Sequence, residues 1–439
     1  MYAIFLMKFA FCENAGYPYL YYRSMKKFTA CYFVLAFIFL FNTRVVHAQM
    51  APATKGADSG IQPAAARLDL YLPLLKGKSV AVFANQTSVV GNTHLVDTLL
   101  SKGVRITKIF APEHGFRGTA DAGEKVGHSI DAKTGIPLVS LYGKNRKPSA
   151  SDLKDIDVVV FDIQDVGVRF YTYISSLEEL MEAVIEHKKP LVILDRPNPN
   201  GFYVDGPVLE KKFTSFIGMQ PVPVVYGMTI GEYANMLIGE KWLDPAIMAR
   251  LPLKDIRALI RVIPNHGYTH KSKYVLPVKP SPNLPEIQSV YWFPSICFIE
   301  GTVLSEGRGT EKPFQLFGHP SLPKNLKTFT PVSRVGATAP KLKDTLCYGW
   351  DLSGSPEEVL AQVNNRVQIK WLLEAYRLFP EKDKFFLANN FINRLAGNDA
   401  LQQQVRAGKT ESEIRQSWQP KLAAFKKIRS QYLLYPDFE

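Results

Sequence analysis

The sequence predicts an α/β protein with a Rossmann-like, doubly wound and mostly parallel sheet, followed by a C-terminal α+β auxiliary domain. Two observations predict this fold class. From residue 79 to residue 194, apolar runs alternate with segments of helical periodicity. The runs are apolar at successive positions, which is typical of parallel strands that helices cover on both faces. Beyond Tyr291 the pattern changes to short strands and then helices.

The elements of the first domain follow in chain order. Strands are expected at residues 79–85, 104–110, 137–141, 158–162 and 191–194. Helices are expected at residues 93–101, 149–154 and 176–187. A strand at 223–226, a helix at 229–237 and a strand at 260–263 come next. Repeated strand–helix–strand units of this kind form a parallel sheet.

A proline-rich loop at residues 276–285 follows the strand at 260–263. Proline and the residue before it disfavour helix, so the loop is extended and serves either as a linker or as the wall of a cleft. We place the domain boundary at the end of this loop. Residues 67–285 then form the Rossmann-like catalytic domain, and residues 286–439 form the auxiliary domain that completes the cleft.

Two helix starts are marked in the auxiliary domain. Ser355 and Thr410 each begin a capping box, in which a hydroxyl residue and a glutamate three positions later bond to each other's backbone. The helix after Thr410 carries a stripe of apolar residues from Ile414 to Tyr432, typical of a helix with one face in the core. Pro420 in this stripe predicts a break or a kink.

The N-terminal residues 1–48 read as an upstream extension followed by a secretory signal peptide. From Met25 the chain has two lysines, an apolar run at 28–41 and the small residue Ala48 at a cleavage position. This pattern predicts a periplasmic or secreted protein, cleaved near Ala48, with a flexible leader at residues 49–66. The alternative is an uncleaved membrane anchor, although the run is short for a bilayer span.

Composition limits the classes of function. The chain has 439 residues, of which 46% are hydrophobic, so it can bury a large core. Its formal charge of +13 is scattered along the sequence. Without a stripe of lysine and arginine this charge argues against nucleic acid, and it suits an anionic polymer outside the cytoplasm. Beyond the signal segment the cysteines are Cys297 and Cys347, too few for a disulfide framework.

Several kinds of site lack support in the sequence. The first strand is not followed by the glycine-rich motif of dinucleotide-binding proteins, and Gly77 lacks the partner glycine of a phosphate loop. The GxSxG motif of many serine hydrolases is missing. His266 and His270 have no evident third ligand. We therefore expect no metal and no cofactor.

Polar residues follow the ends of four predicted strands. Ligands of open α/β sheets bind outside the carboxyl ends of the strands. The polar segments are 85–87, 112–115, 162–165 and 195–198. Loops in general are polar, which is the simpler explanation. These segments, however, carry acids, amides and arginine in place of the serine, glycine and lysine of ordinary turns, and this favours a binding site.

Carboxylates are the remaining candidates for catalysis. Glycoside hydrolysis needs one carboxylic acid to protonate the leaving oxygen and usually a second carboxylate as base, nucleophile or stabiliser. Glu113 suits the first role, because a cleft at a strand end can keep a carboxyl group protonated. Asp165 and Glu306 are candidates for the second. A surface carboxylate or a helix cap is the alternative explanation for each.

Three arginines follow the same loops. Arg117, Arg169 and Arg308 could each bind a substrate carboxylate through a two-pronged contact. Each could equally form a structural ion pair with a neighbouring acid.

Six ordered motifs resemble those of one enzyme family, the NamZ-type exo-β-N-acetylmuramidases. The motifs are PEHGFRG (112–118), FDIQDVGVRFYTYI (161–174), LDRPNPNG (194–201), VVYGMTIGEYA (224–234), PSPNLP (280–285) and EGTVLSEGRGTEKPF (300–314). The resemblance covers nearly the whole chain from Gly77 onward. It implies a Rossmann-like domain with an auxiliary domain and a cleft between them.

The resemblance also implies an activity. Such an enzyme removes single N-acetylmuramic acid (MurNAc) units from the non-reducing ends of peptidoglycan fragments, so peptidoglycan saccharides are the expected partners. Glu113 would be the proton donor, with Asp165 as its partner and Glu306 as the other candidate. The lactyl carboxylate of MurNAc would be held by Arg169, Arg308 or Arg117.

Further substrate contacts would come from His114, Gln164, Asn198 and Asn283. A periplasmic sugar-binding or wall-binding protein without catalysis is the rival interpretation, because the same fold supports both functions.

Overall fold

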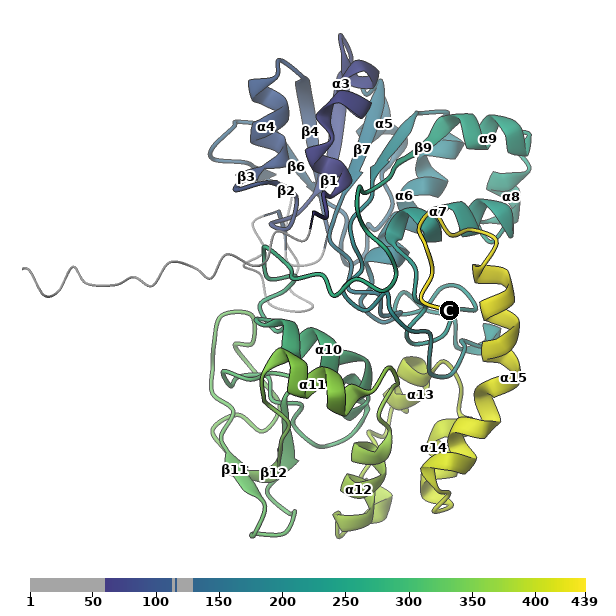
Figure 1. The fold of residues 1–439 in the computed structure, drawn as a ribbon. Coiled ribbons are helices and arrows are strands. Elements are labelled where there is room, and N and C mark those ends of the chain that lie inside the picture. Colours follow the sequence, from purple (N-terminus) through teal and green to yellow (C-terminus); the bar gives the residue numbers. More distant parts are fainter. Residues whose placement is uncertain (1–59, 113–114, 117–128) are drawn as a thin grey trace, which may run out of the picture. The chain divides into compact units, whose positions relative to one another are not determined.

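The main sheet has seven strands within the residues that the structure, a computed structural model, describes: 60–112, 115–116 and 129–439 (Figure 1). The strand order is β5-β6-β4-β1-β7-β8-β9, and all neighbours are parallel except β5 and β6. Numbered along the chain, the parallel strands have the order 3-2-1-4-5-6 of a Rossmann sheet. The predicted fold class is confirmed.

The apolar runs predict all strands of the main sheet except the two-residue β5. The strands are β1 (Ser79–Ala84), β4 (Arg105–Ala111), β5 (Ser129–Ile130), β6 (Pro137–Ser140), β7 (Val158–Asp162), β8 (Leu191–Leu194) and β9 (Ile260–Ile263). Strands β1, β7 and β8 are buried along their whole length, which explains their unbroken apolar sequence. A small hairpin of β2 (Val89–Val90) and β3 (Thr93–His94) follows β1.

Helices cover both faces of this sheet. They are η1 (Ala64–Ala66), α3 (Leu68–Leu75), α4 (Leu95–Ser101), α5 (Ala150–Leu153), α6 (Tyr173–Glu186), α7 (Ile230–Gly239), α8 (Pro245–Met248) and α9 (Leu253–Leu259). The short helix η2 (Lys211–Phe213) buries no residue. Alternate residues of β1 face opposite cores. Val80 and Val82 pack with α3 and α4, whereas Ala81 and Phe83 belong to the core that contains α6 and α7.

Two expectations for this region need correction. Residues 223–226 form no strand; Val225 makes isolated bridges to Val168 and Asp205, because the segment pairs with loops and not with the sheet. The end of the leader expected to be flexible is held in the fold. Gln62 exchanges backbone hydrogen bonds with His266, and Ala64 is fully buried.

Residues 286–439, called here the C-terminal region, combine a small antiparallel sheet with helices. The sheet has the order β10-β12-β11 and consists of β10 (Leu316–His319), β11 (Lys327–Phe329) and β12 (Cys347–Asp351). The helices are α10 (Ile287–Ile296), η3 (Cys297–Gly301), α11 (Pro356–Val363), α12 (Lys370–Leu378), η4 (Lys382–Lys384), α13 (Phe391–Ala396), α14 (Ala400–Arg406) and α15 (Glu411–Arg429). Cys297 and Cys347 are buried free thiols.

The predicted helix starts of this region are confirmed. Ser355 and Thr410 form capping boxes at the start of α11 and α15. Helix α15 continues through Pro420, so the predicted break does not occur. In the described ranges we find no helix with the length and apolar character needed to cross a membrane.

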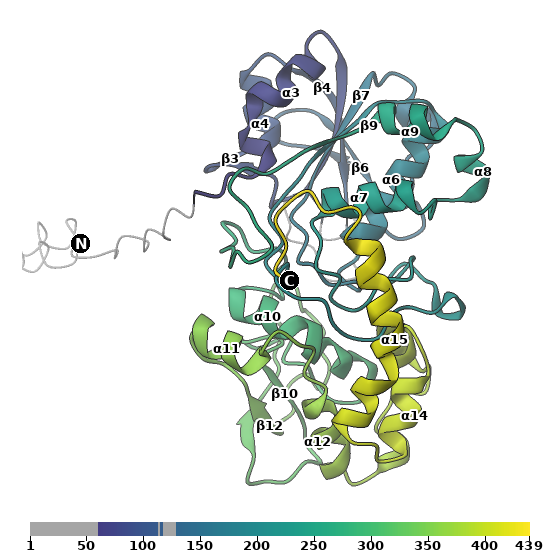
Figure 2. The same ribbon diagram turned by 45° about the vertical axis from the view of Figure 1, so that its right-hand side comes forward.

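The chain returns to the main sheet after α15, and its last residues run beside α7 in both views (Figures 1 and 2). Leu434 N donates to Glu232 Oε1 of α7, and the Tyr435 hydroxyl donates to Asp195 just after β8. Earlier in the chain, Phe170 packs edge-on against Phe293 and Phe298 of the C-terminal region. The sheet-containing part (60–285) and the C-terminal region therefore share one apolar core.

Candidate active site

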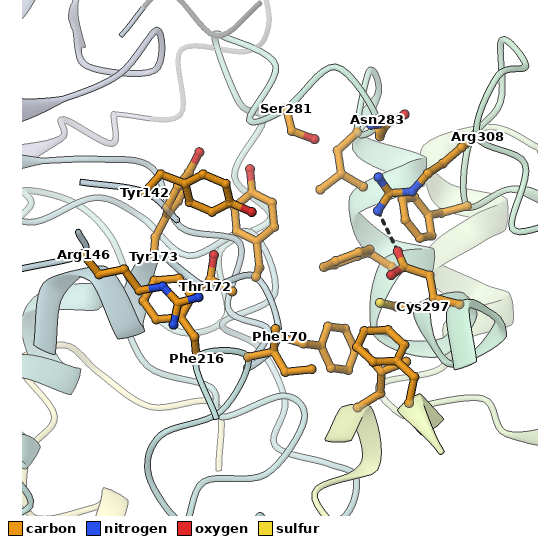
Figure 3. Close-up of a pocket in the computed structure, with 18 residues that line it drawn as sticks. Tyr142, Arg146, Phe170, Thr172, Tyr173, Phe216, Ser281, Asn283, Cys297 and Arg308 are labelled. Atoms are coloured by element: carbon orange, nitrogen blue, oxygen red, sulfur yellow. Dashed lines mark hydrogen bonds and ion pairs between the residues drawn. The ribbon is translucent and has the colours of Figure 1, made fainter. Parts of the chain in front are cut away.

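A cavity of about 280 Å³ lies between the carboxyl edge of the main sheet and the C-terminal region (Figure 3). The sheet-containing part contributes the segment after β6 and the residues between β7 and α6. The C-terminal region contributes α10, η3 and the loop before β10. This volume is near the lower end of the range for small-molecule sites, about 300 Å³, and it suits one sugar ring.

Aromatic side chains form much of the cavity wall. Figure 3 shows Tyr142, Tyr173 and Phe216 on the side of the main sheet. Tyr173 is fixed by Asn85, whose Nδ2 donates to its hydroxyl at 2.9 Å, and Tyr171 donates to the carbonyl of Pro280 at 2.7 Å. Asn85 directly follows β1, the strand beside which the strand order reverses, so the cavity adjoins the place where ligands of such sheets bind.

Arg308 lies on the opposite wall, as expected for a cavity residue, and it is paired with acids. Its Nη2 is 2.6 Å from Glu300 Oε1, and its Nε is 3.3 Å from Glu306 Oε1. Lys341 Nζ lies 2.8 Å from Glu306 Oε2. Among the described residues that line the cavity, Glu300 is the one carboxylate, whereas Glu306 lies behind Arg308.

Asn283 also lines the cavity, with its position fixed by the backbone. Its Nδ2 donates to the carbonyl of Gly336 at 2.8 Å. Its Oδ1 is the polar atom that remains for a ligand. This residue and Arg308 are the predicted site residues that the structure places in the cavity wall.

Three other predicted residues lie close to one another and do not line the cavity. Gln164 Nε2 donates to the carbonyl of Pro197, and Asn198 Nδ2 donates to the carbonyl of Met228. Asp165 accepts hydrogen bonds from Tyr226 and from the backbone of Gly167. Burial raises the pKa of Asp165 to about 6, although these hydrogen bonds oppose the rise.

The close packing of Asp165 and Asn198 depends on one glycine. Gly167 has a φ of 74°, and a Cβ atom added there would lie 2.3 Å from the side-chain amide of Asn198. Only glycine tolerates both conditions. The DVG sequence at residues 165–167 is therefore explained by this tight turn.

Arg169 is buried away from the cavity. Its guanidinium donates to the carbonyls of Pro207, Val222 and Leu395 at 2.7–2.9 Å, and it has no measurable exposure. Burial lowers the pKa of Arg169 to about 9. This placement favours a structural role over the substrate contact expected from the sequence.

Glu113, His114 and Arg117 lie outside the described residues, so their roles stay predictions. The described Pro112 follows β4, which runs parallel to β6. Leu141 N donates to the carbonyl of Ala111, so the chain leaves β4 beside the segment that carries Tyr142.

Arg146 also lines the cavity, although it is not among the residues predicted from the sequence. Its guanidinium carbon Cζ lies over the Phe216 ring, 4.0 Å from the ring centroid. Its position a few residues after the strand at 137–140 could have indicated a place near the carboxyl edge of the sheet. The neighbouring lysines, however, are typical of a loop exposed to solvent.

Comparison with known proteins follows the same division of the chain. The family descriptions "Exo-beta-N-acetylmuramidase NamZ, N-terminal" and "Exo-beta-N-acetylmuramidase NamZ, C-terminal" match residues 80–288 and 291–435. The peptidoglycan beta-N-acetylmuramidase NamZ of Bacillus subtilis (strain 168) is 36% identical over 428 residues, which cover 91% of this chain and 97% of that protein.

Two solved structures from Bacteroides fragilis NCTC 9343, both DUF1343 family proteins, have similar folds. The first has a TM-score of 0.77 and 43% identity, and the match covers 86% of this chain and 99% of that one. The second has a TM-score of 0.69 and 28% identity, with coverage of 85% and 99%.

Proposed function

This chain belongs to the NamZ family of exo-β-N-acetylmuramidases, and we propose that it removes single MurNAc units from the non-reducing ends of peptidoglycan fragments. The observation that carries the proposal is the cavity at the carboxyl edge of the main sheet. Its volume of about 280 Å³ suits one sugar ring, and its wall combines aromatic rings, two arginines and a carboxylate. A site for a single terminal sugar is what exo-acting hydrolysis requires.

The proposed chemistry assigns the proton transfer to Glu113. In the sequence this residue directly follows Pro112, and Pro112 follows β4, the neighbour of the strand β6 that leads to Tyr142. The bond to the leaving sugar breaks as the glycosidic oxygen takes up the proton, and water completes the hydrolysis.

A second carboxylate stabilises the positive charge that develops on the sugar ring. Glu300 suits this role because it lines the cavity, and its contact with Arg308 fixes its direction. Asp165 and Glu306, the candidates from the sequence, lie one layer further from the cavity. They suit a supporting role, since Asp165 holds the turn at Gly167 and Glu306 holds Arg308.

The test is an assay on the chain without its signal segment, residues 49–439. We expect it to release the chromophore from a chromogenic β-MurNAc glycoside and to free one MurNAc at a time from defined peptidoglycan saccharides. Chromatography of the products separates this result from internal cleavage. A sugar-binding protein without catalysis would bind these compounds and release nothing, which would contradict the proposal.

A variant tests the proton donor. Glu113→Gln cannot donate the proton, so we expect kcat to fall on the order of a hundredfold or more. The melting temperature and the affinity for free MurNAc should stay as in the unchanged protein. Full turnover by a folded Glu113→Gln variant would disprove this assignment.

We also propose that the protein acts in the periplasm or outside the cell. The basic start at Met25, the apolar run at 28–41 and Ala48 support this location. N-terminal sequencing of the protein made in a bacterial host, after cell fractionation, tests it. A protein that retains Met25 and stays in the cytoplasm would contradict it.

A further inference from the structure

The cavity holds two arginines in different electrostatic surroundings, on opposite walls (Figure 3). Arg308 contacts the carboxylates of Glu300 and Glu306, and Lys341 contacts Glu306 as well. Two positive and two negative charges therefore compensate one another on that wall. A substrate carboxylate placed there would meet two glutamates, and their repulsion would oppose binding.

Arg146 makes no such ion pair in the described part of the chain, although the charge of Glu179 acts on it from a greater distance. Within the described residues its guanidinium makes no ion pair and no hydrogen bond, and its Nε is buried without a partner. The next residue, Lys147, is paired with Glu182 at 3.0 Å and does not line the cavity. The terminal nitrogens Nη1 and Nη2 of Arg146 are not buried in this way and also have no acceptor among the described residues, so a ligand carboxylate can supply one.

Phe216 fixes the direction in which Arg146 offers its donors. The guanidinium carbon lies 4.0 Å from the centre of the Phe216 ring, within the range of a cation–π contact. Such a contact restricts the guanidinium, and it leaves the outer edge, Nη1 and Nη2, for a ligand, since Nε is buried. The edge of a guanidinium matches a carboxylate through two parallel hydrogen bonds.

We propose that Arg146, held by Phe216, binds the lactyl carboxylate of the MurNAc unit and so distinguishes it from N-acetylglucosamine. This inference rests on the proposed function, because it names the residue that selects the substrate of that same site. It replaces Arg169, which is buried, and Arg308, which is already paired, in the role expected from the sequence. Phe216 is a positioning residue in this arrangement.

The experiment compares two substrates that differ by one charge. One is a chromogenic β-MurNAc glycoside, and the other is the same compound with its lactyl carboxylate converted to an amide. We expect Arg146→Ala to lower kcat/KM for the carboxylate substrate by about 10- to 100-fold, mainly through KM, since a charge-assisted hydrogen bond is lost. For the amide we expect little change, so the preference for the charged substrate disappears.

Two further variants separate this role from a structural one. Arg146→Lys keeps the charge without the paired geometry, so part of the preference should return. Lys147→Ala removes a neighbouring charge outside the cavity and should leave the preference unchanged. Melting temperatures show whether each variant is folded. An undiminished preference in folded Arg146→Ala would overturn the inference.

Calorimetry of free MurNAc and free N-acetylglucosamine distinguishes this inference from the proposed function. If the unchanged protein hydrolyses neither glycoside but binds MurNAc, and Arg146→Ala loses that binding, the catalytic function fails and the inference stands. A second outcome is that the unchanged protein binds free MurNAc no better than N-acetylglucosamine and hydrolyses the MurNAc glycoside and its amide equally well. In that case the inference is wrong while the enzyme activity stands. If it neither binds nor hydrolyses MurNAc compounds, both fail.

Discussion

The carboxyl group of Glu178 lies inside the protein, where its negative charge would oppose folding. Its Oε1 accepts a hydrogen bond from Gln220, and Oε2 has no partner among the described residues. Burial is the main reason why the pKa of Glu178 rises to about 8, and Gln220 partly offsets the rise. In the unfolded chain the same group loses its proton near pH 4.3. The unfolded state therefore binds fewer protons between these two pH values, and stability falls as pH rises through this window.

Glu178→Gln should remove this pH dependence. We expect the free energy of unfolding of the unchanged protein to fall between pH 5 and pH 8 by on the order of 2–4 kcal/mol relative to the variant. Urea unfolding at several pH values measures the difference. Glu357→Gln, at an exposed position, is the matched control and should parallel the unchanged protein. If the stability of Glu178→Gln also changed with pH in parallel with that of the unchanged protein, Glu178 would have to carry a charge in the folded state.

Single residues also show where prediction from sequence ends. Strand ends correctly indicate the edge of the sheet where the cavity lies, because parallel strands bring their carboxyl ends together. They do not indicate the direction of each side chain. Asp165 and Asn198 follow strands as expected, but they bond to the backbone of neighbouring loops and do not line the cavity, whereas Arg146 does. That choice depends on carbonyl groups and rings that arrive from distant segments.

Among the elements, the C-terminal tail after α15 is anchored to the main sheet by a buried hydroxyl group. Tyr435 donates to Asp195 Oδ2 at 2.5 Å and accepts from the backbone N–H of Asn265 at 2.8 Å. Both partners are buried. Tyr435→Phe leaves them short of one bond each while the ring still fills its place. We expect a loss of about 1–3 kcal/mol in the free energy of unfolding.

Urea unfolding of the two proteins at pH 7 measures this loss. Tyr432→Phe is the control, because its hydroxyl bonds to Glu240 at a partly exposed position, where water replaces the lost partner. Its effect should be the smaller one. An equal or larger effect at Tyr432 would contradict the view that the buried hydroxyl anchors the tail.

The elements themselves are largely predictable from local patterns. Apolar runs mark β7 and β8 to the residue, and the capping boxes at Ser355 and Thr410 mark helix starts, because both signals are contained in a few adjacent residues. The prediction of a strand at 223–226 was wrong because the backbone partners of a segment are not contained in its own sequence. Its apolar residues pack as predicted, but its backbone partners are loops near Val168 and Asp205, which no local pattern reveals.

At the scale of the whole molecule, long-range contacts join the sheet-containing part to the C-terminal region. Arg169 reaches the carbonyl of Leu395, 226 positions away, and Arg415 pairs with Asp205 at 2.7 Å. The sequence predicts a boundary after residue 285, and this boundary stays a prediction. Ser59–Glu439 nevertheless forms one compact unit. Contacts between residues far apart in the chain produce no periodic pattern in the sequence. The sequence therefore could not predict that the two parts form one compact unit.

One unit of this kind should unfold in one step, and the tryptophans allow a test. Trp242 lies before the proposed boundary, and the other four tryptophans lie after it, at positions 292, 350, 371 and 418. Tryptophan fluorescence therefore reports mainly on the C-terminal region, while far-ultraviolet circular dichroism reports on the whole chain. For residues 49–439 we expect the two urea transitions to coincide, as for a two-state protein.

The isolated segment 67–285 provides the complementary result. Without the C-terminal region the buried guanidinium of Arg169 loses the carbonyl of Leu395, and Phe170 loses its contacts with Phe293 and Phe298. A buried charge with one of its hydrogen bonds missing and an exposed apolar surface both oppose folding. We therefore expect this segment to lack a cooperative transition. Separate transitions in the long chain, together with a cooperative transition in the segment, would instead establish two independent domains and a cavity assembled by their docking.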